Sequence, residues 1–345
     1  MSSAGEQPLQ GETAARVLVA GASGYAGALA ASLVWSHPRL ELVRTTARTD
    51  AGKRLDELYP DGGVPMTLEP PAESDADGID AAIVAYPHGA SAEAVAALRA
   101  AGVKVVDLSA DFRLRDPDLY ARWYGEHPAP ELIADAVYGL TELNRDRIAG
   151  ADLVANPGCY PTASVLALAP LAEASLIDDV VVDAKSGVSG AGRAKAEQLR
   201  EVVEGDDSLA YGVAGHRHSP EISQVLSGLG ANGASLTFVP HLLPFDQGEL
   251  VSCYVRTTRE VGAEELEGLY RDRYDGEPFV EVVSEPPGAA GVRGTNLCRI
   301  HVTVDPVSGR AMAFAAIDNL WKGAASQAVQ NLNLMLGLPE GEGIS

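Results

Sequence analysis

The sequence has few basic residues for its length. Its 345 residues include 26 Lys and Arg against 48 Asp and Glu, which gives a formal net charge of −22. Proteins that bind nucleic acids or anionic membranes present basic surfaces, so this balance argues against both kinds of partner. An anionic small-molecule ligand would have to be held by local Arg or Lys side chains and by backbone N–H groups.

Cysteines and long apolar runs are also scarce. Cys159, Cys253 and Cys298 are the three cysteines, and their spacing fits neither a disulfide framework nor a zinc site, which predicts a reducing compartment and no bound metal. The polar first residues lack the apolar core of a signal peptide. The longest apolar stretch, residues 162–177, is interrupted by proline and glutamate and is too short to span a bilayer. We therefore expect a soluble cytoplasmic protein.

Short β-branched segments alternate with helical ones in the first half of the chain, which is typical of βαβ units and a parallel sheet. The predicted strands are residues 16–21, 40–46, 80–87, 103–109 and 152–156. After about residue 178 the strands are longer and several alternate, as in a mixed or antiparallel sheet. Residues 318–337 return to helical spacing. The length and this change of pattern predict an α/β protein of two domains.

The glycine-rich segment VLVAGASGYAG follows the first predicted strand and opens the first predicted helix. Gly21, Gly24 and Gly27 would let the backbone turn tightly and approach a pyrophosphate, which helix N–H groups and the helix dipole would bind. The spacing is GxxGxxG rather than the GxGxxG of the common dinucleotide fingerprint, so a plain tight turn is the alternative interpretation.

The end of the second predicted strand indicates which dinucleotide binds. An NAD site usually has Asp or Glu there to hold the ribose 2′-hydroxyl. Here Thr46 and Arg48 occupy that place, and an arginine suits the 2′-phosphate of NADP. Asp50, two residues later, is the counter-indication. We predict NADP as the cofactor.

Cys159 lies on a bend in the segment NPGCYP. Pro161 suits the first position of the following helix, so the thiol would sit just before a helix N-terminus, where the dipole and unpaired N–H groups favour the thiolate. We interpret Cys159 as a nucleophile, with a structural turn cysteine as the alternative. Cys253 and Cys298 lie on apolar strand faces and are expected in the core.

A nucleophilic cysteine usually works with a histidine that is distant in sequence. The segment YGVAGHRHSPEIS contains His216, His218 and Glu221, which are candidates for acid/base service to Cys159. A polar loop with a capped helix start and a metal site are the alternatives, although one HxH with one Glu is weak metal-site spacing.

Other histidines and two arginines have positions that suggest a role. His88 follows the third predicted strand at the carboxyl edge of the sheet, where a dinucleotide would lie, whereas His37 and His127 precede prolines in polar turns and are expected at the surface. Arg113, in SADFRL, is a candidate clamp for a carboxylate or phosphate. Arg193 ends the Gly/Ser-rich loop DAKSGVSGAGR, which offers N–H groups and hydroxyls to an oxyanion. An ordinary surface ion pair explains either arginine equally well.

Together these motifs resemble the N-acetyl-γ-glutamyl-phosphate reductase family of the aspartate-semialdehyde dehydrogenase superfamily. The similar stretches run in family order over roughly residues 15–338 and are VAGASGYAG, YPHG, DLSADFRL, NPGCYPTA, SGVSGAGR, GHRHSPEI and DNLWKGAASQAVQN. Tyr86, Trp321 and Ser326 depart from the residues usual in the family.

The resemblance implies a fold with an inserted domain. Residues 15–157 and 318–345 would form a Rossmann domain that binds NADP. Residues 158–317 would form an α+β domain, built on a mixed sheet, that binds the substrate and joins a homodimer or homotetramer. Residues 1–14 are expected to be a disordered lead.

The resemblance also implies a reaction: NADPH-dependent reduction of N-acetyl-L-glutamyl 5-phosphate to N-acetyl-L-glutamate 5-semialdehyde and phosphate, a step of arginine biosynthesis. Cys159 would form a thioester and His216 would manage the protons, while His218 and Glu221 would hold or bind the substrate. The implied cofactor contacts are Gly21, Ser23, Gly24, Tyr25, Gly27, Thr46, Arg48, His88, Gly187 and Asn319. The implied substrate contacts are Arg113, Asn156, Ser186 and Arg193.

Other functions fit the sequence less well. A reductase for aminoadipyl or glutamyl phosphate linked to an acidic carrier protein would need a basic docking patch, and the sequence has no basic run. An aspartate-semialdehyde dehydrogenase is disfavoured by the GHRHSPEI and DNLWKG stretches. A non-catalytic NADP-binding regulatory module would not require a poised thiol.

The position of Arg48 predicts a cofactor preference. We expect a higher kcat/KM with NADPH than with NADH, because only NADPH carries the 2′-phosphate that Arg48 would pair with. Steady-state kinetics with both cofactors measures the ratio. A higher efficiency with NADH would contradict this prediction.

Overall fold

The computed structural model describes residues 7, 9–10, 12–72, 76–193, 195–196, 199 and 207–344. The chain forms two compact units. Unit 1 runs to Pro157 and resumes at Ala324, and unit 2 spans Gly158–Gly323. The chain therefore returns to unit 1 at residue 324, whereas the predicted return is at residue 318.

Unit 1 contains a six-stranded parallel sheet in the order β2-β1-β3-β4-β6-β5. Its elements are β1 (Ala15–Ala20), α1 (Tyr25–Ser36), β2 (Leu40–Thr46), α2 (Leu55–Leu58), η1 (Pro60–Gly62), β3 (Ala81–Val84), α3 (Ala90–Ala100), β4 (Lys104–Asp107), α4 (Pro117–Tyr124), η3 (Pro130–Leu132), β5 (Val137–Tyr138), α5 (Thr141–Ala149), β6 (Leu153–Ala155) and α10 (Ser326–Met335). The central strands β3 and β6 are buried along their whole length, as expected for a parallel sheet covered on both faces.

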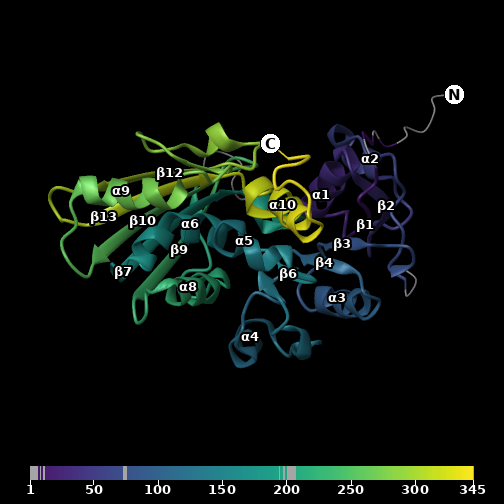
Figure 1. Ribbon diagram of the computed structural model, residues 1–345, viewed down its shortest axis with the longest axis horizontal. Helices are drawn as coiled ribbons and strands as arrows, with labels where there is room; N and C mark the ends of the chain where they lie inside the picture. Colours follow the sequence, from purple (N-terminus) through teal and green to yellow (C-terminus); the bar gives the residue numbers. More distant parts are fainter. Residues whose placement is uncertain are drawn as a thin grey trace. The chain divides into compact units, whose positions relative to one another are not determined.

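The last helix, α10, comes from the opposite end of the sequence and packs within unit 1 on α1 and α5 (Figure 1). The predicted lead, residues 1–14, lies largely outside the described residues. Gln7 is described, and its side-chain amide donates a 3.0 Å hydrogen bond to the carbonyl of Val34 and accepts one from the amide of Leu42 at 2.8 Å. This residue is therefore held against unit 1.

Unit 2 contains a seven-stranded mixed sheet in the order β11-β12-β13-β10-β7-β9-β8, in which the β7–β9 and β11–β12 pairs are parallel and the others antiparallel. Its elements are α6 (Cys159–Glu173), β7 (Ile177–Gly187), η4 (Val188–Ala191), β8 (Leu209–Ala210), α8 (His218–Leu229), β9 (Ser235–Leu243), β10 (Glu249–Thr257), α9 (Ala263–Tyr274), β11 (Val280–Val282), η5 (Ala289–Val292), β12 (Cys298–Val304) and β13 (Ala311–Ile317). A five-residue π-helix, η6 (Trp321–Ala325), leads back to unit 1.

Helices α6, α8 and α9 contact one another through α6 and lie over one face of this sheet (Figure 1). The strand residues under them are apolar at every second position, as in Val251, Cys253 and Val255 of β10, all fully buried. Cys298 of β12 is also fully buried. The prediction that Cys253 and Cys298 are core residues is therefore confirmed.

Several local expectations need correction. The segment predicted to be helical over 318–337 opens with the π-helix η6, in which the Gly323 amide donates to the Asp318 carbonyl, five residues back, at 2.9 Å. The Asp318 carboxylate accepts the amides of Leu320 and Trp321 at 2.9 and 3.1 Å. His37 and His127, expected at the surface, are 0% and 7% exposed. Each ring accepts backbone amides from the turn that follows it, so the turns fold around the rings rather than presenting them to solvent.

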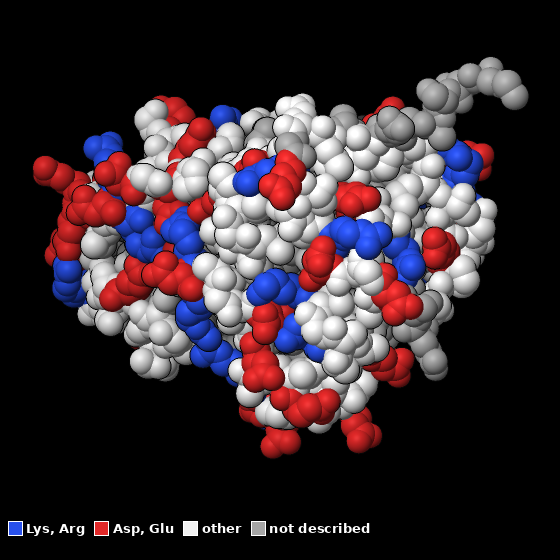
Figure 2. All heavy atoms as spheres, turned by 45° about the vertical axis from the view of Figure 1, so that its right-hand side comes forward, with Lys and Arg blue, Asp and Glu red and all other residues white. Residues whose placement is uncertain are grey.

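Charge on the surface is mixed. On the face shown in Figure 2, Lys and Arg side chains are interspersed with Asp and Glu and form no continuous basic area. Short ion pairs such as Arg145–Glu340 and Arg256–Asp178, both 2.7 Å, are examples of this interleaving along the chain. In the part of the chain that the structure describes, no helix combines the length and the apolar character needed to cross a membrane.

Candidate functional site

In the glycine-rich turn of unit 1, backbone atoms of the turn lie in close contact with other backbone atoms. Gly21 has φ +82°, and a Cβ there would lie 2.6 Å from the carbonyl oxygen of Ala85. A Cβ on Gly27 would lie 2.2 Å from the carbonyl oxygen of Gly21. Both positions therefore require glycine. Gly24 is the N-cap of α1, and no side chain caps this helix start, so it presents backbone N–H groups suited to a phosphate.

The end of β2 lies beside this turn, because the amides of Gly21 and Ala22 both donate to the carbonyl of Thr46 at 2.9 Å. The Thr46 hydroxyl lies 2.6 Å from the Tyr86 hydroxyl, and the exposed Arg48 guanidinium lies 5.3 Å from the centre of the Tyr86 ring. The ring thus supports an arginine at the surface next to the turn, as a 2′-phosphate site requires.

Asp50, the counter-indication to NADP, is itself paired. Its carboxylate is buried and accepts a 2.8 Å hydrogen bond from Lys53, so its charge is compensated within the same loop. The arrangement of a glycine turn, an uncapped helix start and Arg48 fits an NADP phosphate site.

The other predicted cofactor contacts of unit 1 include Ser23, Tyr25 and His88, which interact with neighbouring loops. Tyr59 donates its hydroxyl to the Ser23 carbonyl at 2.8 Å and packs edge-on against Tyr25, with ring centres 6.2 Å apart. His88 accepts the Ala110 amide on Nδ1 at 3.2 Å. The ring orientation of His88 is therefore set by the loop after β4.

Arg113 and Asn156, predicted to bind substrate, are buried. Both form hydrogen bonds within unit 1, close to Pro157, where its first segment ends. Arg113 donates to the carbonyls of Asn156 and Leu108 at 2.8 and 2.7 Å. The Asn156 amide donates to the Ala324 carbonyl at 3.2 Å and its oxygen accepts from Asn331 at 3.0 Å. These bonds hold the residues just before the nucleophile candidate.

Cys159 is the first residue of α6 and is half-buried. The helix therefore begins two residues before Pro161, because a proline has no N–H to lose anywhere in the first turn of a helix. Gly158 is the N-cap and its amide donates to the Glu221 carboxylate at 3.0 Å. The thiol thus lies at the positive end of the helix dipole, where a thiolate is favoured.

A second close contact restricts the space around Cys159. A Cβ on Gly323, in the π-helix η6, would lie 2.8 Å from the Cys159 Cβ. The amide of Gly323 donates to the carbonyl of Asp318 at 2.9 Å. Because Gly323 has no side chain, its backbone can lie directly beside the Cys159 side chain.

The predicted histidines gather on the aromatic residue that follows Cys159. The ring centres of His216 and His218 lie 5.9 and 5.8 Å from that of Tyr160. Glu221, in the first turn of α8, is 1% exposed, and its carboxylate accepts the Gly158 amide. The three residues of the GHRHSPEI motif are thus collected around the start of α6.

The His216 ring is in a defined tautomer. Its Nδ1 accepts the backbone amide of His218 at 3.2 Å, so in the neutral ring the hydrogen is on Nε2. Burial, and then the neighbouring Arg217, lower the pKa of His216 to about 4. At neutral pH this histidine is therefore uncharged and acts as a hydrogen-bond donor through Nε2.

The loop SGVSGAGR after β7 is tied to the region before η6. Asn319 donates to the Ser189 hydroxyl at 2.9 Å and accepts the Gly248 amide at 2.7 Å. A Cβ on Gly187 would lie 2.5 Å from the Asp246 carbonyl. Ser186 is buried, whereas Arg193, beyond η4, is half-buried. Gly187 and Asn319 belong to unit 2 and the other predicted cofactor residues belong to unit 1.

Two residues of this region were missed by the sequence analysis. Tyr211 donates its hydroxyl to that of Tyr160 at 3.3 Å, and its ring centre lies 5.5 Å from that of His216. Glu249, the first residue of β10, is 0% exposed, and burial raises the pKa of its carboxyl to about 8. A signal existed for Glu249, because it is an acid in register with the apolar positions 251, 253 and 255.

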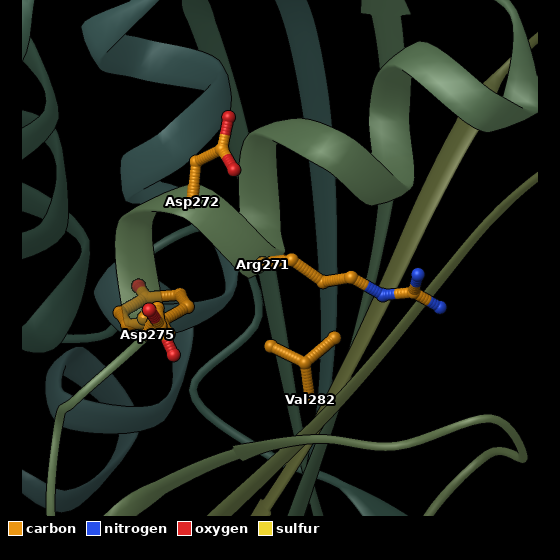
Figure 3. A pocket seen from close by; sticks show the side chains of 5 residues that line it. Arg271, Asp272, Asp275 and Val282 are labelled. Carbon is orange, nitrogen blue, oxygen red and sulfur yellow. The ribbon is translucent and has the colours of Figure 1, made fainter.

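A separate surface pocket of about 460 Å³ lies between α9 and β11 (Figure 3). It is lined by Arg271, Asp272, Tyr274, Asp275 and Val282. Arg271 is paired with Glu267 at 3.0 Å, and none of the predicted site residues lines the pocket. We assign it no role. The described residues also include no cluster of three His, Cys, Asp or Glu side chains that would hold a metal ion.

Comparison with known proteins gives matches along nearly the whole chain. Residues 16–151 match the semialdehyde dehydrogenase NAD-binding domain, and residues 159–319 match the semialdehyde dehydrogenase dimerisation domain. An N-acetyl-gamma-glutamyl-phosphate reductase of Dehalococcoides mccartyi is 47% identical over 326 residues, 93% of this chain and 95% of the relative. One from Halorhodospira halophila is also 47% identical, over 94% of this chain and 96% of the relative.

Solved structures share the fold at lower identity. Aspartate semialdehyde dehydrogenase II of Vibrio cholerae, complexed with ASA, superposes with a TM-score of 0.72 at 19% identity and covers 95% of this chain and 99% of that one. Aspartate semialdehyde dehydrogenase of Candida albicans, solved with NADP, gives 0.67 at 15% identity over 93% of this chain and 98% of that one. The α/β fold with a nucleotide-binding domain and a mixed-sheet domain is confirmed.

The geometry of His216 predicts its titration. We expect long-range proton–nitrogen NMR correlations to show a neutral ring with hydrogen on Nε2 from pH 7 down to about pH 4, because burial opposes the imidazolium. His216→Gln, which lacks the ring, identifies the signal. A protonation midpoint near the ordinary histidine value would contradict the prediction.

Proposed function

Because this chain belongs to the N-acetyl-γ-glutamyl-phosphate reductase family, we propose that it reduces N-acetyl-L-glutamyl 5-phosphate to N-acetyl-L-glutamate 5-semialdehyde and phosphate, with NADPH as the reductant, in arginine biosynthesis. The observation that carries the proposal is Cys159 at the first position of α6. The half-buried thiol there has both the dipole and the access that a nucleophile needs. We propose the cytoplasm as its compartment, since a reducing environment keeps such a thiol reactive.

In the proposed reaction the Cys159 thiolate attacks the acyl carbon, the C–O bond to phosphate breaks, and a thioester forms. Bound NADPH supplies the hydride that reduces this thioester. The C–S bond then breaks, the electron pair returns to sulfur and the aldehyde leaves. His216, neutral and protonated on Nε2, is proposed to donate a hydrogen bond to the oxygen that becomes negative as the acyl carbon turns tetrahedral.

The supporting residues act through position. We propose that Glu221 keeps Gly158, and hence Cys159, in place through the 3.0 Å bond, and that His218, beside Tyr160, bounds the substrate site. Arg113, Ser186, Asn156 and Arg193 are our candidates for the anionic groups of the substrate. The glycine turn with Arg48 is the proposed site for the phosphates of NADPH.

The surface charge bears on the choice of substrate. An acidic carrier protein would need a basic surface on which to dock, whereas this chain has 26 Lys and Arg against 48 Asp and Glu. Opposite charge across an interface favours docking, and like charge opposes it. A free small-molecule substrate is therefore our choice over a carrier-linked one.

We also propose that the chain forms a homodimer or homotetramer through the sheet of unit 2. The region 159–319 matches a dimerisation domain. On the sheet face opposite α6, α8 and α9, half-buried side chains alternate with the buried ones; they include Asp183, Lys185, Tyr254, Met312 and Phe314. A mixed apolar and charged face of this kind suits contact with a second copy.

The reverse reaction tests the proposed function. We expect the purified chain to reduce NADP in the presence of N-acetylglutamate semialdehyde only when phosphate is added, because phosphate must release the acyl group from the thioester. Cys159→Ser should lower kcat/KM by about 10³-fold or more. Cys298→Ala, which changes a fully buried thiol, is the matched control and should remain active. A wild-type chain inactive at every salt concentration would overturn the substrate assignment, and an active C159S would overturn the mechanism.

The oligomer is tested by sedimentation. We expect Phe314→Glu to shift the assembly toward monomer, weakening association by about tenfold or more, because a buried unpaired charge in an interface costs several kcal/mol. Val307→Glu is the control, since Val307 is 93% exposed in the turn between β12 and β13. A monomeric wild-type chain would refute the proposal.

A further inference from the structure

Asp111 is a buried acid of unit 1 that the proposed reaction does not use. It lies in the loop after β4 and is 0% exposed. Its carboxylate accepts the Gly89 amide on both oxygens, at 2.9 and 2.8 Å, and the Ala92 amide at 2.9 Å. The hydroxyl of Tyr120 donates to it at 2.7 Å. A buried carboxylate is tolerated where hydrogen-bond donors surround it, so these three donors account for its burial.

The start of α3 is capped by Asp111 rather than by a side chain of its own. Gly89 is the N-cap of α3, has φ +78° and carries no capping side chain. The amide of the third helical residue, which an N-cap side chain would ordinarily bind, is that of Ala92. Asp111, nineteen residues later in the sequence, accepts this amide instead. The turn that leads into α3 is therefore fixed by a side chain from another loop.

The loop between β3 and α3, which ends at this turn, borders the glycine-rich turn at its beginning. A Cβ on Gly21 would lie 2.6 Å from the carbonyl oxygen of Ala85, the first residue of the loop. Further along the loop His88 is exposed, and its Nδ1 accepts the amide of Ala110, the residue before Asp111, at 3.2 Å. One loop thus contacts the proposed phosphate site at its beginning and the Asp111 segment at its end.

His88 is held in one orientation and one tautomer. Because its Nδ1 accepts the Ala110 amide, the hydrogen of the neutral ring is on Nε2. The ring packs edge-on against Tyr124 of α4, with ring centres 5.0 Å apart. Tyr124 stacks on Tyr120, which donates its hydroxyl to Asp111. Both contacts of the His88 ring are therefore made by neighbours of Asp111: Ala110 along the chain, and Tyr124 through Tyr120.

The backbone of Asp111 is itself anchored. Its amide donates to the Ser109 hydroxyl at 3.0 Å, and its carbonyl accepts a 2.7 Å hydrogen bond from Nε2 of the buried His127. Nε2 carries the hydrogen because Nδ1 of His127 accepts the Ala129 amide. Ser109 in turn donates its hydroxyl to Asp107 at 2.6 Å. The position of the Asp111 carboxylate is thus set by hydrogen bonds within unit 1.

We propose that Asp111 is a positioning residue of the NADPH site: its carboxylate holds the loop between β3 and α3 so that His88 is in place before the dinucleotide binds. A loop that is ordered in advance does not have to be ordered by the ligand, and the affinity is higher for that reason. This role rests on the proposed function, in which NADPH binds beside the glycine-rich turn. His88 is the residue through which Asp111 acts.

A helix cap alone is the alternative role for Asp111. In that role the carboxylate stabilises α3, and its loss lowers the melting temperature without a specific effect on the cofactor. A positioning role adds an effect on the dissociation constant of NADPH. Cofactor affinity therefore separates the two roles.

The experiment is a titration of the purified chain with NADPH, followed by the fluorescence of the nicotinamide and without substrate. Asp111→Asn replaces one accepting oxygen with an NH₂ group, so the loop loses part of its anchor. We expect the Kd for NADPH to rise about tenfold in this variant. At saturating NADPH we expect kcat to fall less than about threefold, because the carboxylate is bonded to the loop and not to the reacting groups.

Asp116→Asn is the matched control. Asp116 also caps a helix of unit 1, since its carboxylate accepts the Asp118 amide at the start of α4 at 2.9 Å, but it is exposed. Asparagine caps a helix as well as aspartate does. We therefore expect the control to bind NADPH as tightly as the wild type.

A double-mutant cycle shows whether Asp111 acts through His88. We expect His88→Ala to raise the Kd for NADPH, and D111N to raise it less than about twofold further once the imidazole is gone. An unchanged Kd in D111N would overturn the proposal. So would an increase of about tenfold that persists in the H88A background, because the effect would then not pass through His88.

Hydrogen exchange tests the proposal without a variant. The Gly89 and Ala92 amides donate to a buried carboxylate, so we expect them to exchange slowly before NADPH is added, with less than about threefold further slowing afterwards. Amides that become protected only with NADPH would show that the cofactor orders the loop. That result would overturn the proposal even if D111N did not fold.

The two proposals fail in different ways. If NADPH binding responds to D111N as expected but the wild-type chain shows no phosphate-dependent reduction of NADP, the positioning role stands and the substrate assignment falls. If the reaction is observed and D111N binds NADPH as tightly as the wild type, the reaction stands and Asp111 is only a helix cap. A wild-type chain that does not bind NADPH would overturn both.

Discussion

The hydrogen bond from the Gly158 amide to the Glu221 carboxylate, 3.0 Å long, joins the N-cap of α6 to the first turn of α8. The bond holds the N-cap residue, and the residue after the N-cap lies at the positive end of the helix dipole. That residue is Cys159. The His216–His218 segment, just before Glu221, packs on Tyr160, just after Cys159, so the proposed nucleophile and its histidines meet where α6 and α8 begin.

Burial around this contact favours neutral groups. It raises the pKa of Glu249 to about 8 and lowers that of His216 to about 4, so acid and base alike are uncharged at neutral pH. It also raises the pKa of Tyr211. The N-terminus of α6 favours a negative charge on Cys159, its first residue.

Much of the fold followed from periodicity alone. The β-branched runs of unit 1 became parallel strands, with residues 40–46 forming β2 as expected, because a strand buried on both faces has a recognisable sequence. Turn chemistry was less reliable. Pro161 suggested a helix start two residues late. The prolines after His37 and His127 suggested exposed turns, but both rings are buried and accept hydrogen bonds from backbone amides of the residues that follow.

The sequence by itself determined the glycine turn, the arginine at the end of β2 and a cysteine at a helix start, because each depends on residues that are neighbours along the chain. Only the tertiary structure brought Glu249, Tyr211 and the π turn of Gly323 to Cys159. Glu249, whose pKa the Cys159 thiol influences, stands about ninety residues later in the sequence. Its raised pKa arises from burial, and burial is decided by which elements pack over a side chain rather than by the residues beside it.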